Sequence, residues 1–209
     1  MFGSKRKKVD SSAEKPVVQA SQIAPKNSSI AAPGQNGAAS TFSQNEDAQR
    51  RTAIALRRSA ALAQILTVLM RSPQHKHVAL ADLEWLVFPP LLSGQYSVAQ
   101  VNSKDGKTSF PAAVVLWASV SADVDKRLSE NLNSPVRLRP DEWKSGNILW
   151  LIEAVGDPRI LPSLLNQLSE RAFKGKEVKV RTRDDQGKVI LQSLRTAIAS
   201  QSSTAETRK

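Results

Sequence analysis

The residues of this chain best suited to acid–base chemistry are two histidines that stand close together. His75 and His77 are the only histidines among 209 residues, and histidine is the side chain that exchanges a proton near neutral pH. Ser72-Pro73 precedes His75, with Gln74 between them. Proline lacks an amide proton and disfavours helical backbone in the residue before it, so this pair predicts the end of a helix and a rigid loop that holds His75. We therefore take His75 as a candidate general base, against the plainer alternative of a solvated loop histidine.

Glu153 is the carboxylate most suited to assist a histidine. It interrupts the apolar run Ile148 to Ile152, and a carboxylate at the end of a buried strand must be paired, protonated or hydrogen-bonded. If it faces His75, it can hold the imidazole in one tautomer and stabilise the imidazolium. The alternative is a residue at the sheet end that reaches solvent.

Gly156-Asp157-Pro158 follows this strand and leads into a predicted helix. Free amides at a helix start, together with the helix dipole, favour an anion or an oxyanion. An ordinary turn between a strand and a helix explains the same residues equally well.

Composition excludes several kinds of chemistry. The chain has no cysteine, which rules out disulfides, thiolate nucleophiles and cysteine-bound metals. Two histidines at i, i+2 without a third ligand nearby do not favour zinc, so we expect no metal. We find no apolar run near the roughly 20 residues of a membrane span, and we expect none.

The charge balance points to an acidic partner. Thirty basic and 19 acidic residues leave a formal net charge of +11, which suits nucleic acid, an anionic membrane surface or an acidic protein. The four tryptophans stand mostly in apolar contexts, where core packing is favoured over stacking on bases. We therefore expect no nucleic-acid partner, although a basic nucleic-acid-binding module stays an alternative.

The order of predicted elements indicates an α/β or α+β fold. Residues 1–46 have few large apolar side chains and are predicted to be a disordered leader, residues 47–198 a single domain, and residues 199–209 a disordered tail. Apolar spacing predicts a helix over residues 47–70 and a helical piece over 79–87 that ends at Pro89-Pro90. Strands over 96–101 and 112–120 are joined by a hairpin turn, and the second is expected at the sheet centre. A helix over 121–132, a strand over 148–152, a helix over 159–173, an edge strand near 178–180 and a last strand from 189 complete the pattern.

Three blocks of this sequence together resemble the RTX toxin-activating lysine acyltransferases. The blocks are Ser72-Pro73-Gln74-His75, Gly94-Gln95-Tyr96 followed by Trp117-Ala118-Ser119, and Asp141-Glu142-Trp143-Lys144-Ser145-Gly146 running to Gly156-Asp157. Their order and approximate spacing match that family from about Ile65 to Leu191. The resemblance implies an acetyltransferase-like mixed, largely antiparallel sheet flanked by helices.

The resemblance also implies an activity, partners and a site. It implies a cytoplasmic enzyme that moves an acyl group from acyl carrier protein to an internal lysine of an RTX protoxin, with no permanently bound cofactor. A homodimer is compatible with it. It places the family histidine on His75 and the family acid on Glu153, with Ser72, Gly146 and Gly156 as residues that contact substrate.

Two departures from the family pattern keep a further alternative open. The family acid is usually aspartate, whereas Glu153 is one methylene longer, and a polar residue of the family is Leu86 here. A family member with impaired catalysis, which only binds the toxin or the carrier protein, is the alternative that these departures support. Within the enzymatic interpretation, His75 acts as a general base or takes up the acyl group itself.

Overall fold

The computed structural model describes residues 37–206. The chain divides at Ser43 into two compact units, and the second, which begins at Gln44, contains the elements discussed below apart from the start of the first helix. The leader proposed for residues 1–46 lies mostly outside the described residues. The long helices are α1 (Gly37–Arg71), α4 (Ala122–Glu130), α5 (Leu161–Arg171) and α6 (Leu194–Glu206), and the short ones are α2 (Leu83–Leu86) and α3 (Phe88–Ser93).

A five-stranded mixed sheet is the centre of this unit, so the fold is α+β. Its strands follow chain order across the sheet: β1 (Tyr96–Asn102), β2 (Ser109–Val120), β3 (Ile148–Gly156), β4 (Val178–Arg183) and β5 (Val189–Ser193). Every neighbouring pair is antiparallel except β3 and β4, which are parallel. The prediction of a mixed, largely antiparallel sheet flanked by helices is confirmed.

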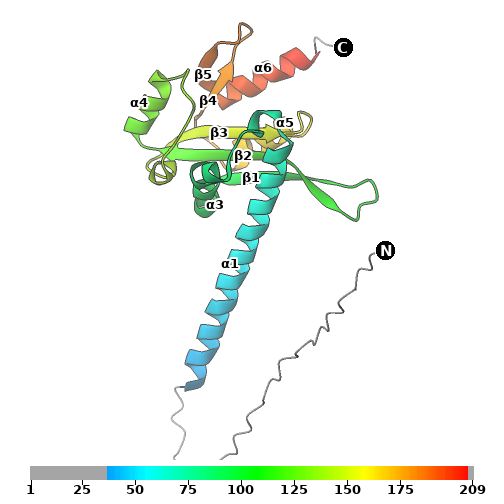
Figure 1. Cartoon of the computed structure of the whole chain (residues 1–209), viewed down its shortest axis with the longest axis vertical. Coiled ribbons are helices and arrows are strands. Elements are labelled where there is room, and N and C mark those ends of the chain that lie inside the picture. Colours follow the sequence, from blue (N-terminus) through cyan, green and yellow to red (C-terminus); the bar gives the residue numbers. More distant parts are fainter. Residues whose placement is uncertain (1–36, 207–209) are drawn as a thin grey trace, which may run out of the picture. The chain divides into compact units, whose positions relative to one another are not determined.

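The two faces of the sheet are covered by different helices (Figure 1). One core cluster joins α1, α2, α3 and α4 to alternate residues of β2, including Val114 and Leu116. The other joins α5 and α6 to the intervening residues, including Ala113 and Val115. Strand residues point alternately to opposite faces, so the middle of β2, from Ala112 to Ala118, is apolar because both of its faces are covered.

Several element boundaries differ from the sequence-based expectation. Helix α1 begins ten residues before the predicted start at Asp47, within the range predicted to be leader, and α6 occupies part of the predicted disordered tail. Pro89 and Pro90 do not end a helix but lie in the first turn of α3, where the missing amide protons have no helical partner to lose. Strand β4 is not at the sheet edge, because β5 pairs along its other side, and the middle strand is β3, not β2.

Helix α1 differs from the composition-based expectation in another respect. Within its segment Asn45–Arg71 one 18-residue window has a mean hydropathy of 1.4, so by length and composition this helix could cross a membrane, contrary to the expectation of no span. The core helix of a soluble protein passes the same test, and the last turns of α1 bury Ile65, Val68 and Leu69 against the sheet. The length and composition of α1 are therefore weak evidence that this helix spans a membrane.

Candidate functional site

The loop after α1 places His75 as the sequence predicts. Ser72 is extended, with φ −81° and ψ 125°, and Pro73 opens a short 3-10 turn, Pro73–His75. The extended backbone at Ser72 is what proline imposes on its predecessor. The amide of His75 donates to the carbonyl oxygen of Ser72 over 3.1 Å, and the amide of Val78 donates to that of His75 over 3.1 Å. The His75 backbone is thus fixed on both sides.

A bulge in β3 brings Glu153 to the same side of the sheet as His75. In the register with β2, Leu116 pairs with Glu153 but Trp117 pairs with Leu151, which leaves Ile152 as an extra residue. Trp150 and Ile152 pack on the α1 side, and beyond the bulge so does Val155. Strict alternation from Ile152 would have turned residue 153 to the α5 side. The extra residue reverses the alternation and directs Glu153 to the α1 side.

The His75 ring lies between Glu153 and Ser72. Nε2 of His75 is 3.5 Å from Oε2 of Glu153, with the two side chains 8% and 26% exposed. Nδ1 is hydrogen-bonded to Oγ of Ser72 over 3.0 Å. A ring nearly removed from water and held at both nitrogens has one orientation, which is what a positioned base requires. His77, in contrast, is exposed.

A cavity of about 1030 Å³ lies beside this histidine. Ser72 and Gln74, on either side of Pro73, line it together with Gly156. Apolar side chains make up much of the remaining wall, and two arginines also contribute. These further residues are Val68, Val101, Phe110, Pro111, Ala112, Ala154, Val155, Pro158, Leu161, Asn102, Asp157, Arg71 and Arg159. A large, mostly apolar cavity with a few polar groups is typical of a ligand site.

Gly156 is required by its position in the cavity wall. Its φ is +145°, and a Cβ there would lie 2.4 Å from the carbonyl oxygen of Ala112 and from Cα of Ala113. The next amide, that of Asp157, donates to the same carbonyl oxygen over 2.9 Å. Only glycine allows the end of β3 to approach β2 this closely. Helix α5 begins at Leu161, so Gly156 itself does not belong to a helix start as the sequence suggested.

The structure does not bring Gly146 to the cavity. Gly146 precedes β3, whereas Gly156 ends it, and the amide of Gly146 donates to the carbonyl oxygen of Ser119 over 3.0 Å. A Cβ on Gly146 would lie 2.4 Å from the carbonyl oxygen of Val120. Its close packing on β2 explains the glycine, and the predicted contact with substrate has no support.

The sequence block Asp141–Gly146, which contains Gly146, has a structural role. Arg127 of α4 donates two hydrogen bonds, of 2.8 and 2.7 Å, to the buried carboxylate of Glu142, and the amide of Arg139 adds a third over 2.9 Å. Ser145 accepts from the amide of Ser121, the N-cap of α4. The block therefore fixes α4 and the end of β2.

Replacing Glu142 by glutamine is expected to lower the free energy of unfolding by about 1 to 2 kcal/mol at neutral pH. The hydrogen bonds from Arg127, with a smaller contribution from the Arg139 amide, outweigh burial and hold the pKa of Glu142 below its ordinary value of 4.5. A depressed carboxyl pKa stabilises the fold above 4.5, and this stabilisation is lost as the pH falls through the folded-state value.

The difference between parent and Glu142→Gln should therefore shrink in acid. Urea denaturation at neutral pH and at about pH 3 measures it. Asp141→Asn, which changes the exposed neighbouring carboxylate, is the control and should have little effect. A difference that is equally large in acid would contradict the assignment.

No group of three or more histidine, cysteine, aspartate or glutamate residues within residues 37–206 is placed to hold a metal ion. The groups that the site presents are the histidine, the carboxylate and the nearby cavity. A histidine beside a carboxylate and near a partly apolar cavity has the residue types that proton transfer on an apolar substrate would need.

Comparison with known families identifies the class of protein to which this chain belongs. The chain belongs to the RTX toxin acyltransferase family, whose model matches residues 54–194. The family is one of acyltransferases that act on RTX toxins. No curated protein matches this chain. The resemblance inferred from the sequence blocks is confirmed, and the matched range contains His75, Glu153 and the residues of the cavity wall.

Sequence reasoning missed part of the cavity. It found Ser72 and Gly156 but not Val101, Phe110 or Arg71. The signal available for the first two was two large apolar residues beside the polar hairpin turn Lys104–Lys107, where solvent exposure would be expected.

Proposed function

We propose that this protein transfers a fatty acyl group from acyl carrier protein to one or more internal lysines of an RTX protoxin, in the cytoplasm. The family match supports acyl transfer to an RTX toxin in general. The observation that carries the finer proposal is the His75–Glu153 pair beside an apolar cavity, because a fatty acyl chain needs an apolar site and a lysine amine needs a base.

The contacts of His75 support a proposed role for each of its ring nitrogens. A carboxylate accepts but does not donate, so Glu153 favours the tautomer with the proton on Nε2. The lone pair is then on Nδ1, which faces Ser72. Because Ser72 lines the cavity, a lysine amine in the cavity can pass a proton to Nδ1 directly or through the serine hydroxyl.

The reaction then proceeds by attack on a thioester. A lysine is protonated at neutral pH and must lose a proton before it can act as a nucleophile. The ammonium first releases one proton to solvent. The neutral amine nitrogen then forms a bond to the thioester carbonyl carbon while His75 takes its second proton, the carbon–sulfur bond breaks, and the imidazolium gives that proton to the departing thiolate. The products are an amide on the lysine and the free thiol of the carrier.

Backbone amides near the end of β3 are suitable oxyanion donors. Strands β3 and β4 pair only over Leu149–Leu151 and Val178–Val180, so β3 continues past Ile152 without β4 beside it. That edge runs along Ala154, Val155 and Gly156, which all line the cavity. Amides already aimed at the reacting carbonyl would stabilise the oxyanion without reorganisation.

Acylation of a protoxin tests the proposal. The full chain is incubated with acyl carrier protein carrying palmitate and with an RTX protoxin, and the toxin is analysed by peptide mass spectrometry. We expect the mass of the acyl group on lysine ε-amines. No modification with any acyl carrier protein tested would contradict the proposal, and carrier binding without turnover would favour the impaired family member.

Four arginines of α1 suit an acidic carrier. Arg50, Arg51, Arg57 and Arg58 are exposed, and residues 57 and 58 are one helical turn before Ala61, which is buried against the sheet. Residues three and four apart share a helix face. These arginines therefore extend the face of α1 that packs on the fold, where an acidic protein can be attracted.

Substituting Arg57 and Arg58 together by glutamine is expected to raise the KM for acyl carrier protein by roughly threefold to tenfold, with kcat unchanged, because rim charges act mainly on encounter. The difference should largely disappear at about 0.5 M salt, where charges are screened. Steady-state kinetics at two salt concentrations measure this. Lys174→Gln with Lys188→Gln, which removes the same charge elsewhere, should leave KM at the parental value. Tight, salt-sensitive DNA binding lost in the arginine variant would instead support the nucleic-acid alternative.

A further inference from the structure

The β1–β2 hairpin carries two large apolar side chains that the fold leaves in solvent. Val101 is 40% exposed and Phe110 is 47% exposed. The two residues are direct partners in the antiparallel register, and side chains of directly opposed residues lie on the same face of a two-stranded ribbon. Together they form one apolar surface, the Val101–Phe110 pair.

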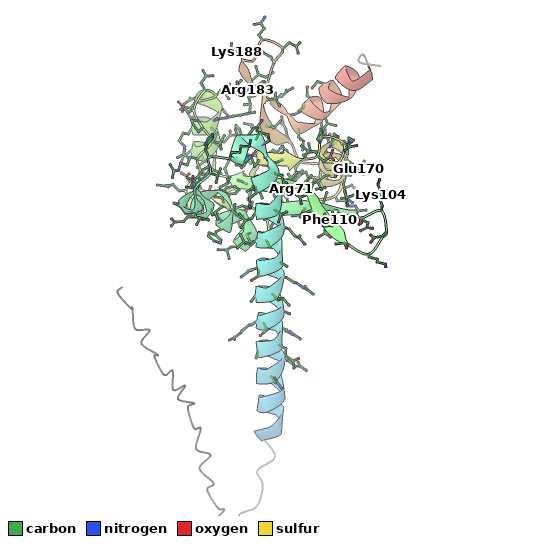
Figure 2. All side chains as sticks on the ribbon, turned by 45° about the vertical axis from the view of Figure 1, so that its right-hand side comes forward. Arg71, Lys104, Phe110, Glu170, Arg183 and Lys188 are labelled. Atoms are coloured by element: carbon green, nitrogen blue, oxygen red, sulfur yellow. The ribbon has the colours of Figure 1, made fainter. Side chains whose placement is uncertain are left out.

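The fold itself does not explain this pair. Strand β3 pairs with β2 only as far as Ala113, so residues 109–112 have β1 as their only strand neighbour. Neither core cluster includes Val101 or Phe110. Figure 2 shows Phe110 on the part of β2 that runs out to the turn carrying Lys104, beside the end of α1 that carries Arg71. An exposed apolar pair on a projecting ribbon is unfavourable unless something covers it.

The pair is part of the wall of the cavity that Ser72, the neighbour of the His75 ring, also lines. Val101 and Phe110 line the same cavity as Ser72 and Gly156. Val68 of α1 and Leu161 of α5 add apolar surface to this wall. The cavity therefore extends from Ser72, whose hydroxyl contacts His75, to the hairpin, and its volume of about 1030 Å³ is large for a ligand site, at the top of the usual range of roughly 300 to 1,000 Å³.

We infer that the Val101–Phe110 pair forms the hairpin wall of an acyl-chain subsite and sets the chain length that the enzyme prefers. This inference rests on the proposed function. Its occupant is a saturated fatty acyl chain. Apolar contact without polar partners discriminates such chains by the number of methylenes that they bury and by nothing else.

The size of the effect follows from methylene burial. Each additional methylene that the subsite buries should raise kcat/KM for acyl transfer by about fourfold, which corresponds to about 0.8 kcal/mol. The value of kcat/KM should therefore rise with acyl-chain length until the chain fills the subsite, and should then level off or fall. Shortening Phe110 to alanine enlarges the subsite and moves the maximum to longer chains. Enlarging Val101 to phenylalanine moves it to shorter ones.

The test measures kcat/KM with acyl carrier proteins bearing even-numbered chains from octanoyl to stearoyl. Parent, Phe110→Ala and Val101→Phe are compared as full-length protein, with thermal melting to confirm folding. We expect the two variants to shift the maximum in opposite directions, with the ratio between the longest and shortest chains changing by roughly tenfold. Leu80→Ala, at an exposed leucine outside the cavity wall, should keep the parental profile.

Direct binding separates this inference from the proposed function. Free fatty acids of the same lengths are titrated calorimetrically into each protein. If the parent transfers no acyl chain but its length-dependent binding shifts with Phe110→Ala, the proposed function fails and the subsite stands. If transfer occurs and both variants keep the parental profiles of transfer and binding, the subsite assignment is wrong. Absence of both transfer and fatty-acid binding in the parent overturns both.

Discussion

Replacing His75 by alanine is expected to reduce acyl transfer by at least about 10²-fold, up to about 10⁴-fold, because the variant loses its general base. The ring is 8% exposed and held between Ser72 and Glu153, so no solvent molecule can take its place in the same geometry. Single-turnover transfer from acyl carrier protein to protoxin, followed by mass spectrometry, measures the loss.

His77→Ala is the matched control for this experiment. It removes an imidazole two residues away that is exposed and outside the cavity wall, and it should retain the parental rate. Circular dichroism and thermal melting establish that His75→Ala is folded, since the buried ring also packs between two elements. A folded His75→Ala variant that transfers acyl groups at the parental rate would show that another residue acts as the base.

The His75→Ala variant also shows whether His75 acts as a general base or as a nucleophile that takes up the acyl group itself. If His75 takes up the acyl group itself, the parent incubated with acyl carrier protein alone becomes labelled, and the label is lost in His75→Ala. A histidine that acts only as a base gives no labelled enzyme in the absence of toxin. The contact between Nδ1 and the Ser72 hydroxyl makes Ser72→Ala informative as well, because a label that persists in His75→Ala but disappears in Ser72→Ala would place the acyl group on the serine.

The local features of the site could be predicted from sequence because they depend on short-range geometry. Proline fixes its own φ and restricts the residue before it, so the end of α1 and the 3-10 turn at His75 follow from Ser72-Pro73 alone. The N-cap at Ser121 is equally local, and its Oγ accepts from the amide of Val124. Alternation and helical spacing gave most elements for the same reason.

The position of Glu153 on the α1 side could not be predicted in this way. It depends on a bulge at Ile152 that shifts the β2–β3 register, and no residue type there signals an extra residue. The same holds for Gly146, whose sequence block resembles the family but whose role is set by close packing on Val120 and Ser121. Long-range register and backbone approach are set by tertiary packing, which composition and periodicity do not encode.

Exchanging Glu153 for glutamine is expected to lower kcat by roughly 10²-fold while leaving KM and folding unchanged. The amide has the shape of the carboxylate but no charge, so it neither favours the Nε2–H tautomer nor stabilises the imidazolium that forms in transfer. We expect less than the ~10⁴-fold cost of the same change in a buried catalytic triad, because Glu153 is 26% exposed and its contact with Nε2 is 3.5 Å long.

Glu153→Asp tests whether the longer side chain is matched to this backbone. The bulge places the backbone of residue 153 where a glutamate reaches Nε2 at 3.5 Å, so an aspartate, one methylene shorter, falls short of the ring. We expect an intermediate loss of kcat, because the charge is kept but lies farther from the imidazolium. Glu170→Gln, at an exposed glutamate of α5 (Figure 2), is the matched control and should retain the parental rate. If Glu153→Gln keeps the parental kcat, the carboxylate does not position the base, and Ser72 alone holds the ring.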